Sequence, residues 1–472
     1  MENKKIIKRS VDFAKWYTSI ISEANLIEYG LAKGTMIFKP YSWSIWTNIQ
    51  DILNSYFKKM GIENCSMPLF IPYSEFLKEA KHIEGFAPEL FKVTEIGEKR
   101  LEDPYVIRPT SEIIFCHYFS KNILSYNDLP LILNQWSNVF RVEKNTRPFL
   151  RNSEFFWQEQ HGIFSNEKEA LDFAKKMINL YKKFIEEYLC IPVLMGKKTE
   201  YERFAGADET FTIEAIMQDG QALQCGTSHY LNQNFSKNFN IKFQNKSNQF
   251  EYGYQNSAGV STRLIGAIIM SHSDDNGLVL PPKIAPVQIK INSLFADKSI
   301  EVKNFCKDLS IKLSQKFNVK IDDTEKSIGF KLSEGEVSGI PIQINIGPKD
   351  LENGSLALVY RHDRSKEILN IKDVDINFIE KKLDLISKEL YKKAKENLDK
   401  RIVEVSTLAD FNENISLGNF VSAFWSGTEE DEKKLKETTG ASSRCISDET
   451  KQGVCFFTGK KTNLKVFFAR AY

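Results

Sequence analysis

The sequence of 472 residues carries almost no excess charge, because 64 lysines and arginines stand against 62 aspartates and glutamates, for a net charge of +2. A global basic field that would indicate nucleic-acid binding is therefore missing, although local patches can still bind RNA. Long apolar runs are missing too, since no window approaches the roughly 20 apolar residues of a membrane span. We therefore expect a cytoplasmic protein with no membrane segment.

Cysteine supplies no disulfide framework. Seven cysteines, an odd number, are scattered from Cys65 to Cys455 without regular spacing, which fits a reducing compartment. The sequence also lacks internal repeats and low-complexity runs. What remains is the composition of an ordinary globular protein, with 42% hydrophobic and 27% charged residues, in a chain long enough for about two to three domains.

The stretch from Leu133 to Gly162 contains the most informative pattern. It predicts a strand over about 131–142, a charged turn, and a second, aromatic strand that begins at Arg151. Because side chains alternate along a strand, one face of the second strand carries Arg151, Ser153, Phe155, Trp157, Glu159 and His161. Such a face suits a floor for a flat ring, an anion and a polar ligand, whereas a solvated hairpin with ordinary charge pairs is the alternative.

The segments before this hairpin predict helices and strands around a core. Apolar residues at helical spacing predict one helix over 9–29, and a second helix over 41–60 is predicted to turn Trp43 and Trp46 inward. The second helix lies between the strand-like runs GTMIFKP and PLFIP, and it is either an interface element or a core helix. In VIRPTSE a strand stops at Pro109 and a helix starts, where Thr110 and Glu112 could grip an ammonium group or simply form the helix start.

The segments after the hairpin continue the same domain. A helix is expected over 166–190, and TFTIEAIM and QALQCGTSHYL form a second hairpin around Asp219-Gly220. Thr227 and His229 are polar where a core strand should be apolar. A polar strand then delivers Arg263 to a helix start, a placement that opposes the helix dipole and indicates an anionic ligand.

A change of pattern marks the end of this domain. Residues 283–286 look like a linker, after which the strands VQIKI, PIQINI and LALVY alternate with helices in an α/β domain. A lysine-rich helix with one apolar stripe follows, and residues 402–472 have strand signals of their own.

Taken in order, these pieces resemble the class II aminoacyl-tRNA synthetases, and specifically the prolyl family of the archaeal and eukaryotic-like type. The strings that carry the resemblance are DFAKWYTSIISEANLIEYG, GTMIFKPYSWSIW, SEFLKEAKHIEGFAPE, VIRPTSE, NQWSNVFRVE, RPFLRNSEFFWQEQH, ERFAGAD, CGTSHYLNQNFSKNF and STRLIGA. The resemblance implies an α+β fold: a catalytic domain with an antiparallel sheet over 1–284, an α/β anticodon-binding domain over 285–400, and a small C-terminal α+β domain over 401–472.

The resemblance also implies an activity, namely activation of L-proline by ATP with Mg2+ to prolyl-adenylate and transfer of the prolyl group to the 3' end of tRNA(Pro), by a homodimer. Arg141 and Arg263 would be catalytic, the first holding the α-phosphate and the proline carboxylate and the second clamping the nucleotide. The residues implied to bind ATP are Arg141, Glu143, Arg151, Phe155, Gln224, Thr227 and Arg263. Those implied to bind proline are Thr110, Glu112, Arg141, Trp157, Glu159, His161, Phe204 and His229.

The C-terminal domain departs from the family pattern. Related enzymes often bind zinc there through four cysteines, and the matching positions are Ser426, Asp431, Cys455 and Thr458. One thiolate remains and Cys445 alone does not restore the set, so we expect no structural zinc and no metal held by the protein itself.

The anticodon-binding domain departs from the pattern as well. In GEVSGIPIQINIGPKDLE, Gly335, Ser338 and Gln343 stand where the family has a tryptophan, a lysine and an arginine. Glu336 remains and is expected to read a guanine edge. Fewer cations predict a weaker or rearranged anticodon contact, which can shift to neighbouring Lys349, Arg361 or Lys366.

Other functions stay open at this stage. Residues 163–258 leave no room for the large editing insertion of bacterial-type relatives, so rejection of alanine or cysteine would need a partner in trans. A synthetase for threonine, histidine, serine or glycine is the nearest rival. Zinc ligands would be expected in a threonyl active site, and RPTSE and GTSHYLNQNFSKNF argue against the other three. A catalytically silent paralogue that binds RNA or regulates is the alternative from another class, and Arg141, Arg151 and Arg263 argue against it.

Overall fold

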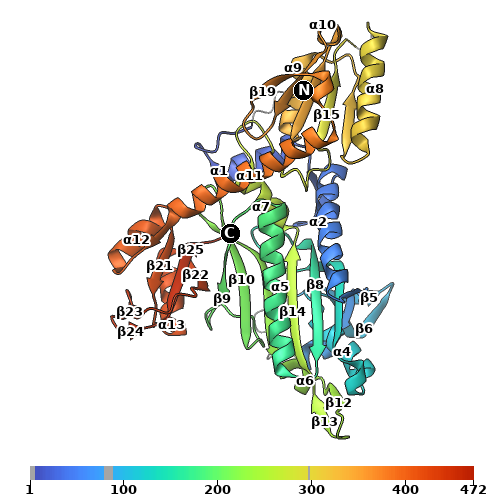
Figure 1. Cartoon of the computed structure of the whole chain (residues 1–472). Helices are drawn as coiled ribbons and strands as arrows, with labels where there is room; N and C mark the ends of the chain where they lie inside the picture. The colour runs from blue at the N-terminus through green and yellow to red at the C-terminus, as the bar shows by residue number, and fades with distance from the viewer. Residues whose placement is uncertain (1–5, 79–88, 296–297) are drawn as a thin grey trace.

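The structure is a computed structural model that describes residues 6–78, 89–295 and 298–472. Residues 79–88, which belong to the string SEFLKEAKHIEGFAPE, lie outside the described residues. Figure 1 shows a central sheet with helices on it, an α/β domain above, and a smaller domain to the left, with the long helix α11 running between the last two.

The central sheet has the strand order β3-β7-β8-β14-β11-β10-β9. It is antiparallel, as expected, except that β3 pairs with β7 in parallel. Its strands are β3 Glu63–Asn64, β7 Leu131–Phe140, β8 Glu154–Phe164, β9 Leu194–Lys197, β10 Glu209–Ile216, β11 Ala222–Asn232 and β14 Tyr254–Ser261. The expected second strand therefore begins three residues late, and Arg151 and Ser153 belong to the turn before β8.

Helices cover one face of this sheet, and α5 packs across β8, β14, β11 and β10. The helices of this part are α1 Phe13–Glu23, α2 Pro40–Lys59, α3 Tyr73–Lys78, α4 Glu112–Asn122, α5 Glu167–Tyr188, α6 Asn234–Asn238 and α7 Arg263–His272, with the 3-10 turn η1 Tyr126–Asp128. Alternation along the strands supplies the core, because Phe211, Ile213 and Ala215 of β10 all face it.

Short strands surround the central sheet in three small groups. They are β1 Ile27–Tyr29 with β2 Met36–Phe38, β4 Phe70–Pro72 with β5 Lys92–Ile96 and β6 Lys99–Ile107, and β12 Lys242–Gln244 with β13 Phe250–Tyr252. The strands predicted from GTMIFKP and PLFIP are thereby confirmed. The strand β6 ends at Ile107, a few residues before the start of α4.

Two predictions for the N-terminal part are wrong. The helix expected over 9–29 ends at Glu23, because Asn25 adopts a left-handed backbone with φ 55° and the chain turns into β1. Trp43 does not point into the core, since it is 38% exposed and contacts the edges of Phe38 and Phe156 instead.

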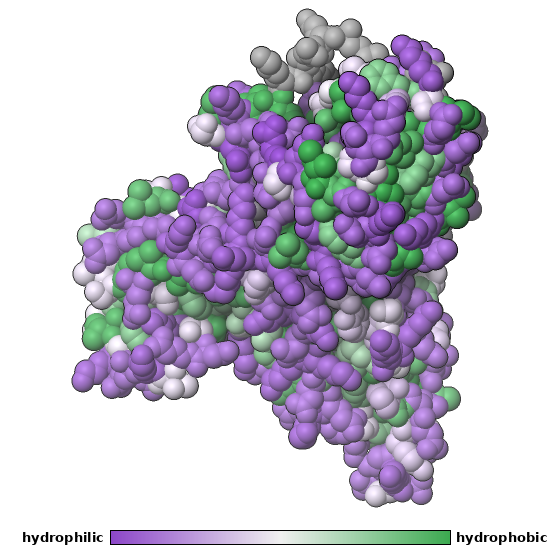
Figure 2. Space-filling view, turned by 45° about the horizontal axis from the view of Figure 1, so that its top comes forward, coloured by the Kyte–Doolittle hydropathy of each residue, from purple (hydrophilic) through white to green (hydrophobic). Residues whose placement is uncertain are grey.

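The α/β domain has the sheet order β16-β15-β17-β18-β19, parallel among its first three strands and antiparallel among its last three. Its elements are β15 Ile289–Ser293, α8 Ile300–Ser314, β16 Val319–Asp322, α9 Ile328–Val337, β17 Ile342–Ile346, α10 Pro348–Glu352, β18 Ser355–Tyr360, β19 Lys366–Asn370, η2 Ile371–Asp373 and α11 Ile376–Arg401. The residues before it are not a free linker, because Ile284 and Ala285 are buried in the main core. Figure 2 shows a mostly hydrophilic surface with apolar residues gathered over this domain at the top.

The last domain is a four-stranded sheet of order β20-β21-β25-β22 with two helices. Its elements are β20 Ile402–Glu404, α12 Leu408–Ser416, β21 Phe420–Phe424, α13 Glu429–Thr439, β22 Ala441–Ile446, β23 Gly453–Val454, β24 Lys461–Thr462 and β25 Lys465–Arg470. A small apolar cluster of Ile216, Ala222, Leu398, Phe420 and Ala469 attaches it to β10, β11 and α11. Within the described ranges, no helix is long and apolar enough to cross a membrane.

Candidate active site

A cavity with a volume of about 360 Å³ lies on one face of the central sheet. Strands β8, β11 and β14 form its floor, the start of α4 forms one wall, and the connection between β9 and β10 forms another. The odd-numbered side chains of β8 from Phe155 to His161 line it, as the alternation predicted. The same cavity collects residues from segments far apart in the sequence, including Thr110, Arg141, Phe204, Gln224 and Arg263.

Glu159 is a buried carboxylate whose oxygens are occupied. The Ser111 hydroxyl donates to Oε1 over 2.6 Å, the Gln135 amide also donates to Oε1, and His161 Nε2 lies 3.1 Å from Oε2. Burial alone would raise the pKa of Glu159, but the hydrogen bonds from His161, Ser111 and Gln135 hold it below its usual range. Glu159 therefore stays ionised and fixes the neighbouring imidazole, which also stacks on Phe115 at 4.1 Å.

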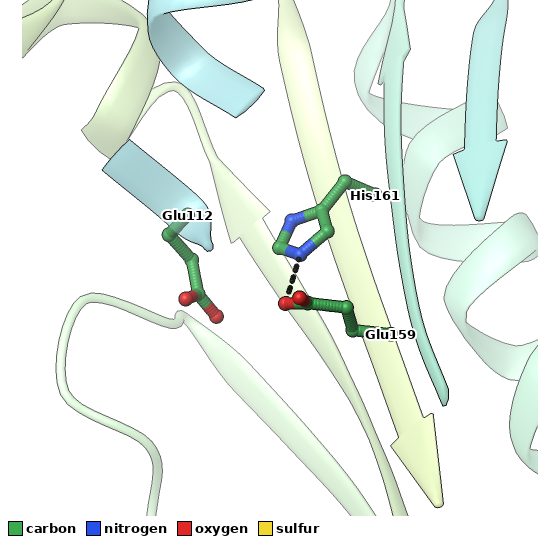
Figure 3. Close-up of side chains that lie close together, drawn as sticks. All are labelled: Glu112, Glu159 and His161. Carbon is green, nitrogen blue, oxygen red and sulfur yellow. Dashed lines mark hydrogen bonds and ion pairs between the residues drawn. The ribbon is translucent and has the colours of Figure 1, made fainter. Parts of the chain in front are cut away.

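Glu112 is the contrasting carboxylate of this site. It is the first residue of α4, it is buried, and it accepts a hydrogen bond from the Thr110 hydroxyl. Burial raises its pKa, against the opposing attraction of His161. Figure 3 shows its side chain directed toward the space in front of Glu159 and His161. A ligand cation placed there would compensate the cost of a buried charge.

Aromatic rings enclose the same space. Phe204 lies 4.6 Å from the His229 ring, and Trp157 and His161 come from β8. Burial and the nearby His161 lower the pKa of His229 to about 3, so this imidazole is neutral at physiological pH. Its Nδ1 lies 3.0 Å from the Thr210 hydroxyl, which also accepts the backbone N–H of Phe204 over 3.2 Å.

Arg141 interacts electrostatically with Glu112 and Glu159 of this pocket and with Arg263 in the rest of the cavity. Its Nε donates to the carbonyl oxygen of Pro109 over 3.0 Å, and its guanidinium carbon lies 5.3 Å from the Phe155 ring and 5.5 Å from the Trp157 ring. The backbone contact and the two rings fix the orientation of the guanidinium. A single cation is thus presented to both halves of the cavity.

The other half of the cavity is strongly positive. Arg263 stands at the start of α7, and burial, together with the neighbouring Arg151 and Arg141, lowers its pKa, which marks a site short of negative charge. Its contacts within the chain are long, at 3.4 Å to the Leu150 oxygen and 3.5 Å to the Gln224 oxygen. Phe155, Gln224 and Thr227 line this half with it, so it can hold an anion beside a flat ring.

Two predicted ATP residues lie outside this cavity. Glu143 and Arg151 line an adjoining hollow with Lys144 and Tyr472, and they form an ion pair of 3.7 Å. Because Arg151 precedes β8 rather than belonging to it, its side chain does not follow the alternation of the strand.

Sequence reasoning missed the segment from Lys198 to Ala205 apart from Phe204. Lys198, Glu202 and Arg203 line the cavity, and so does Thr210 at the start of β10. The string ERFAGAD was the available signal, because it places charges and an aromatic residue directly before a strand. Ser111 and Gln135, which hold Glu159, had no such signal.

The expected anticodon residues lie on the α/β domain, away from the cavity. Glu336 is on α9, where its carboxylate pairs with Arg364 at 2.6 Å, and Lys366 is exposed at the start of β19. Lys349 is exposed on α10. The prediction that Arg361 could serve as a replacement contact is wrong. Arg361 is buried, and both of its terminal nitrogens donate to Asp274, over 2.9 and 2.6 Å. It therefore cannot reach RNA.

Two groups of side chains in the described part of the chain could hold a metal ion: Glu112, Glu159 and His161 in the cavity, and His362, Asp363 and Glu389 on the α/β domain. In the cavity, Glu159 and His161 are already committed to one another and to Ser111 and Gln135. The remaining acceptor, Glu112, suits an ammonium group better than a metal that needs three oxygen or nitrogen ligands.

Family models match three successive parts of the chain. Residues 91–272 match the tRNA synthetase class II core domain (G, H, P, S and T), residues 283–382 match the anticodon binding domain, and residues 408–472 match the prolyl-tRNA synthetase C-terminal domain.

Full-length relatives agree with these models. The chain is 53% identical over 476 residues to the proline--tRNA ligase of Malacoplasma penetrans, with 99% of this chain and 100% of that protein covered. It is 48% identical over 473 residues to the proline--tRNA ligase of Mesoplasma florum, with 99% of both covered. A crystal structure of prolyl-tRNA synthetase from Cryptosporidium parvum, complexed with halofuginone and AMPPNP, superimposes with a TM-score of 0.94 at 35% identity, covering 100% of this chain and 98% of that one.

Proposed function

This chain belongs to the class II prolyl-tRNA synthetases, and on that premise we propose how its cavity divides between the two small substrates. The enzyme activates proline with ATP and transfers the prolyl group to tRNA(Pro). We assign the Glu112 end of the cavity to proline and the Arg263 end to ATP. The observation that carries the division is the position of Arg141 between a buried acidic pocket and an arginine-rich half.

At the proline end, Glu112 and Thr110 would bind the secondary ammonium group. Glu159 and His161 would hold the pocket in shape, and Trp157, Phe204 and His229 would enclose the ring. The neutral state of His229 supports this division, because a charged imidazole would repel the ammonium. Binding the ammonium would favour the ionised form of Glu112, whose pKa burial raises in the empty cavity.

At the ATP end, Phe155 would stack on adenine, and Gln224, Thr227 and Arg263 would hold the ribose and phosphates. The ion pair of Glu143 with Arg151 adjoins this end, so Glu143 would meet the adenine side and Arg151 the γ-phosphate. Mg2+ would arrive on ATP, since it binds through substrate phosphates and few protein oxygens, and the side-chain oxygens of Gln224 and Thr227 fit such a role. Bound there, it would neutralise phosphate charge.

The reaction needs positioning and charge stabilisation more than proton transfer. A proline carboxylate oxygen attacks the α-phosphorus and pyrophosphate leaves, while Arg141 contacts both groups and stabilises the added charge. The terminal ribose hydroxyl of tRNA then attacks the prolyl carbonyl and AMP leaves. Arg263, on the opposite side of the nucleotide, would keep the phosphates in line.

For the outer domains we propose boundaries at residues 284 and 400 and no structural zinc. At the former zinc positions the Ser426 and Thr458 hydroxyls lie 2.6 Å apart, and the Cys455 sulfur accepts the Thr458 N–H. Asp431 is used at the start of α13, where it accepts from Thr428. These contacts support replacement of the metal by hydrogen bonds.

The anticodon contact would centre on Glu336, reading a guanine edge, with Lys366 on the RNA backbone. Glu336 must first exchange its partner, because Arg364 pairs with it in the free chain.

We further propose a cytoplasmic homodimer, the location following from its tRNA substrate. Apolar side chains left exposed on β1, on the turn after it, on β2 and at the start of α2 support a second copy there, and they are Tyr29, Leu31, Ile37 and Trp43. Light scattering that gave the mass of a single chain would reject the dimer.

Rejection of smaller amino acids would need an editing partner, because pocket fit alone discriminates by only about 10 to 200-fold.

Amino-acid-dependent ATP–pyrophosphate exchange across a panel of amino acids tests the assignment. We expect exchange with proline and none with threonine, histidine, serine or glycine. Exchange with none of them would favour the silent paralogue, against which the presence of Arg141 and Arg263 in one cavity argues.

A further inference from the structure

The C-terminal domain touches the wall of the proline pocket. Strand β22 of this domain runs beside β9 so closely that a Cβ on Gly196 would come within 2.2 Å of the Ile446 carbonyl oxygen. Directly after β9 the chain enters residues 198–205, of which Lys198, Glu202 and Phe204 line the cavity. A contact between the C-terminal domain and this segment therefore lies only a few residues from the cavity lining.

A buried ion network forms the first link. Arg444 of β22 donates two hydrogen bonds to one carboxylate oxygen of Glu214, from Nε over 3.0 Å and from Nη2 over 2.7 Å. Lys198 Nζ donates to the other carboxylate oxygen over 2.9 Å. Glu214 is fully buried, and Lys198 and Arg444 are nearly so. Burial alone would raise the pKa of Glu214, but Arg444 and Lys198 hold it below its ordinary range. Glu214 therefore bridges two cations, Arg444 of the C-terminal domain and Lys198 at the cavity wall.

The network lies on the face of β10 that leads to the substrate. Thr210, Thr212 and Glu214 alternate with core residues, so they share one face. The Thr212 hydroxyl donates to Glu214 over 2.8 Å, and the Thr210 hydroxyl contacts both Phe204 N–H and His229 Nδ1. A strand held at Glu214 by the C-terminal domain therefore also positions Thr210, four residues earlier, and with it Phe204 and His229 of the pocket.

Contacts of Thr199 and of Lys436 also hold residues 198–205 to the C-terminal domain. The Thr199 hydroxyl lies 2.9 Å from Ser443 Oγ and donates to Glu432 over 2.9 Å. At the surface, Lys436 of α13 pairs with Glu202 at 3.0 Å and lies over the Tyr201 ring.

These contacts are not needed merely to attach the domain. The apolar cluster around Phe420 and Ala469 already joins it to β10 and β11. Arg401 donates to the carbonyl oxygens of Gly418 and Gln218, each over 2.9 Å.

We propose that Arg444 and Lys436 are positioning residues for proline binding, through which the C-terminal domain holds residues 198–205 against β10. The inference rests on the assignment of this end of the cavity to proline. It gives a domain that has lost the zinc positions of its relatives a role in substrate affinity. The role is indirect, since neither side chain lines the cavity.

The test compares full-length variants in proline-dependent ATP–pyrophosphate exchange, with separate titrations of proline and ATP. Arg444→Met should raise KM for proline about tenfold and KM for ATP much less, and Arg444→Lys should restore part of the loss because it keeps the charge without the paired contact. Phe411→Leu is the matched control, because Phe411 is buried in the same domain against Phe456 and contacts none of the network. The two variants should be compared at equal loss of thermal stability.

Lys436→Met tests the surface contact with Glu202 independently. Its control is Lys433→Met, because Lys433 is exposed on the same helix. We expect a rise of about threefold in KM for proline for Lys436→Met and none for Lys433→Met. If Arg444→Met fails to fold, the comparison of Lys436→Met with Lys433→Met alone tests the inference. Equal KM for proline in each variant and its control would overturn the inference while leaving the proposed function intact. A wild-type chain without proline-dependent exchange would overturn the site assignment and the inference together.

Discussion

The cavity keeps the residues of the family pattern, whereas the two outer domains have replaced several of theirs. In the cavity, the expected ligands of proline and ATP come together, apart from Glu143 and Arg151, which line an adjoining hollow. In the α/β domain, Gly335, Ser338 and Gln343 replace residues that the resemblance would make apolar or cationic. In the C-terminal domain, Ser426, Asp431 and Thr458 stand where thiolates would hold a metal.

The replaced positions are satisfied inside the chain. Gln343 is buried, where it donates to the Leu332 carbonyl over 3.0 Å and accepts from Asn292 over 3.2 Å. Gly335 leaves the room that Gln343 occupies, since a Cβ there would come within 2.4 Å of the amide oxygen. On the proposal that the chain holds no structural zinc, hydrogen bonds within a domain replace a metal or a surface cation, whereas no internal bond can replace a group that must contact a small substrate.

The largest effect is expected from Arg141→Ala. The loss of the cation between the two substrates should lower kcat/KM for proline-dependent exchange by about 10³-fold, because the charge on the reacting phosphate then lacks its partner. The variant should fold, with a melting temperature within a few degrees of the wild type. Arg100→Ala is the control, since Arg100 is exposed on β6. Activity within tenfold of the wild type for Arg141→Ala would contradict the assignment.

Glu112→Gln should weaken proline binding and stabilise the empty chain. KM for proline should rise by about 10²-fold, because a neutral amide cannot balance the ammonium. Burial raises the pKa of Glu112, so its contribution to stability is present below pH 4.5, the ordinary value, and is lost as pH rises through the raised pKa. At neutral pH the amide lacks this penalty, so the melting temperature should increase. A lower melting temperature together with an unchanged KM would contradict the expectation.

Part of the cavity lining was predictable because its residues sit at regular positions. Phe155, Trp157, Glu159 and His161 follow the two-residue repeat of β8, and Arg263 was placed by its position at a helix start. Local chemistry of this kind is readable from one sequence, since the period of an element decides which side chains share a face. The same reasoning failed for Arg151, because the strand begins at Glu154.

The supports of the site were not predictable, because they join distant segments. Ser111 and Gln135 reach Glu159 across 48 and 24 positions, and Arg444 reaches Glu214 across 230. Arg361 shows the converse error: an arginine directly after a strand looks solvated, but Asp274, 87 positions away, buries it. No local pattern distinguishes a cation that will find a buried partner from one that stays at the surface.

Glu336→Ala should affect one function of the enzyme only. Loss of a guanine contact should lower kcat/KM for tRNA charging by about tenfold, while proline-dependent exchange stays at the wild-type level, because α9 lies outside the cavity. Glu352→Ala, on α10 and exposed, is the control for a change of charge on the same domain. Charging at the wild-type rate by Glu336→Ala would remove this residue from anticodon reading and shift attention to Lys366.

The smallest effect should follow from treatment with a zinc chelator. A zinc-selective chelator should leave exchange activity and melting temperature unchanged, provided that Mg2+ is kept in excess, and elemental analysis should find far less than one zinc per chain. The reason is that Ser426, Cys455 and Thr458 already bond to one another, while Asp431 is held by Thr428. Thr458→Val should therefore cost only about 1 kcal/mol of stability, whereas removal of a structural metal ligand would unfold the domain. A content near one zinc per chain, or unfolding by the chelator, would show that the outer domain follows its metal-binding relatives after all.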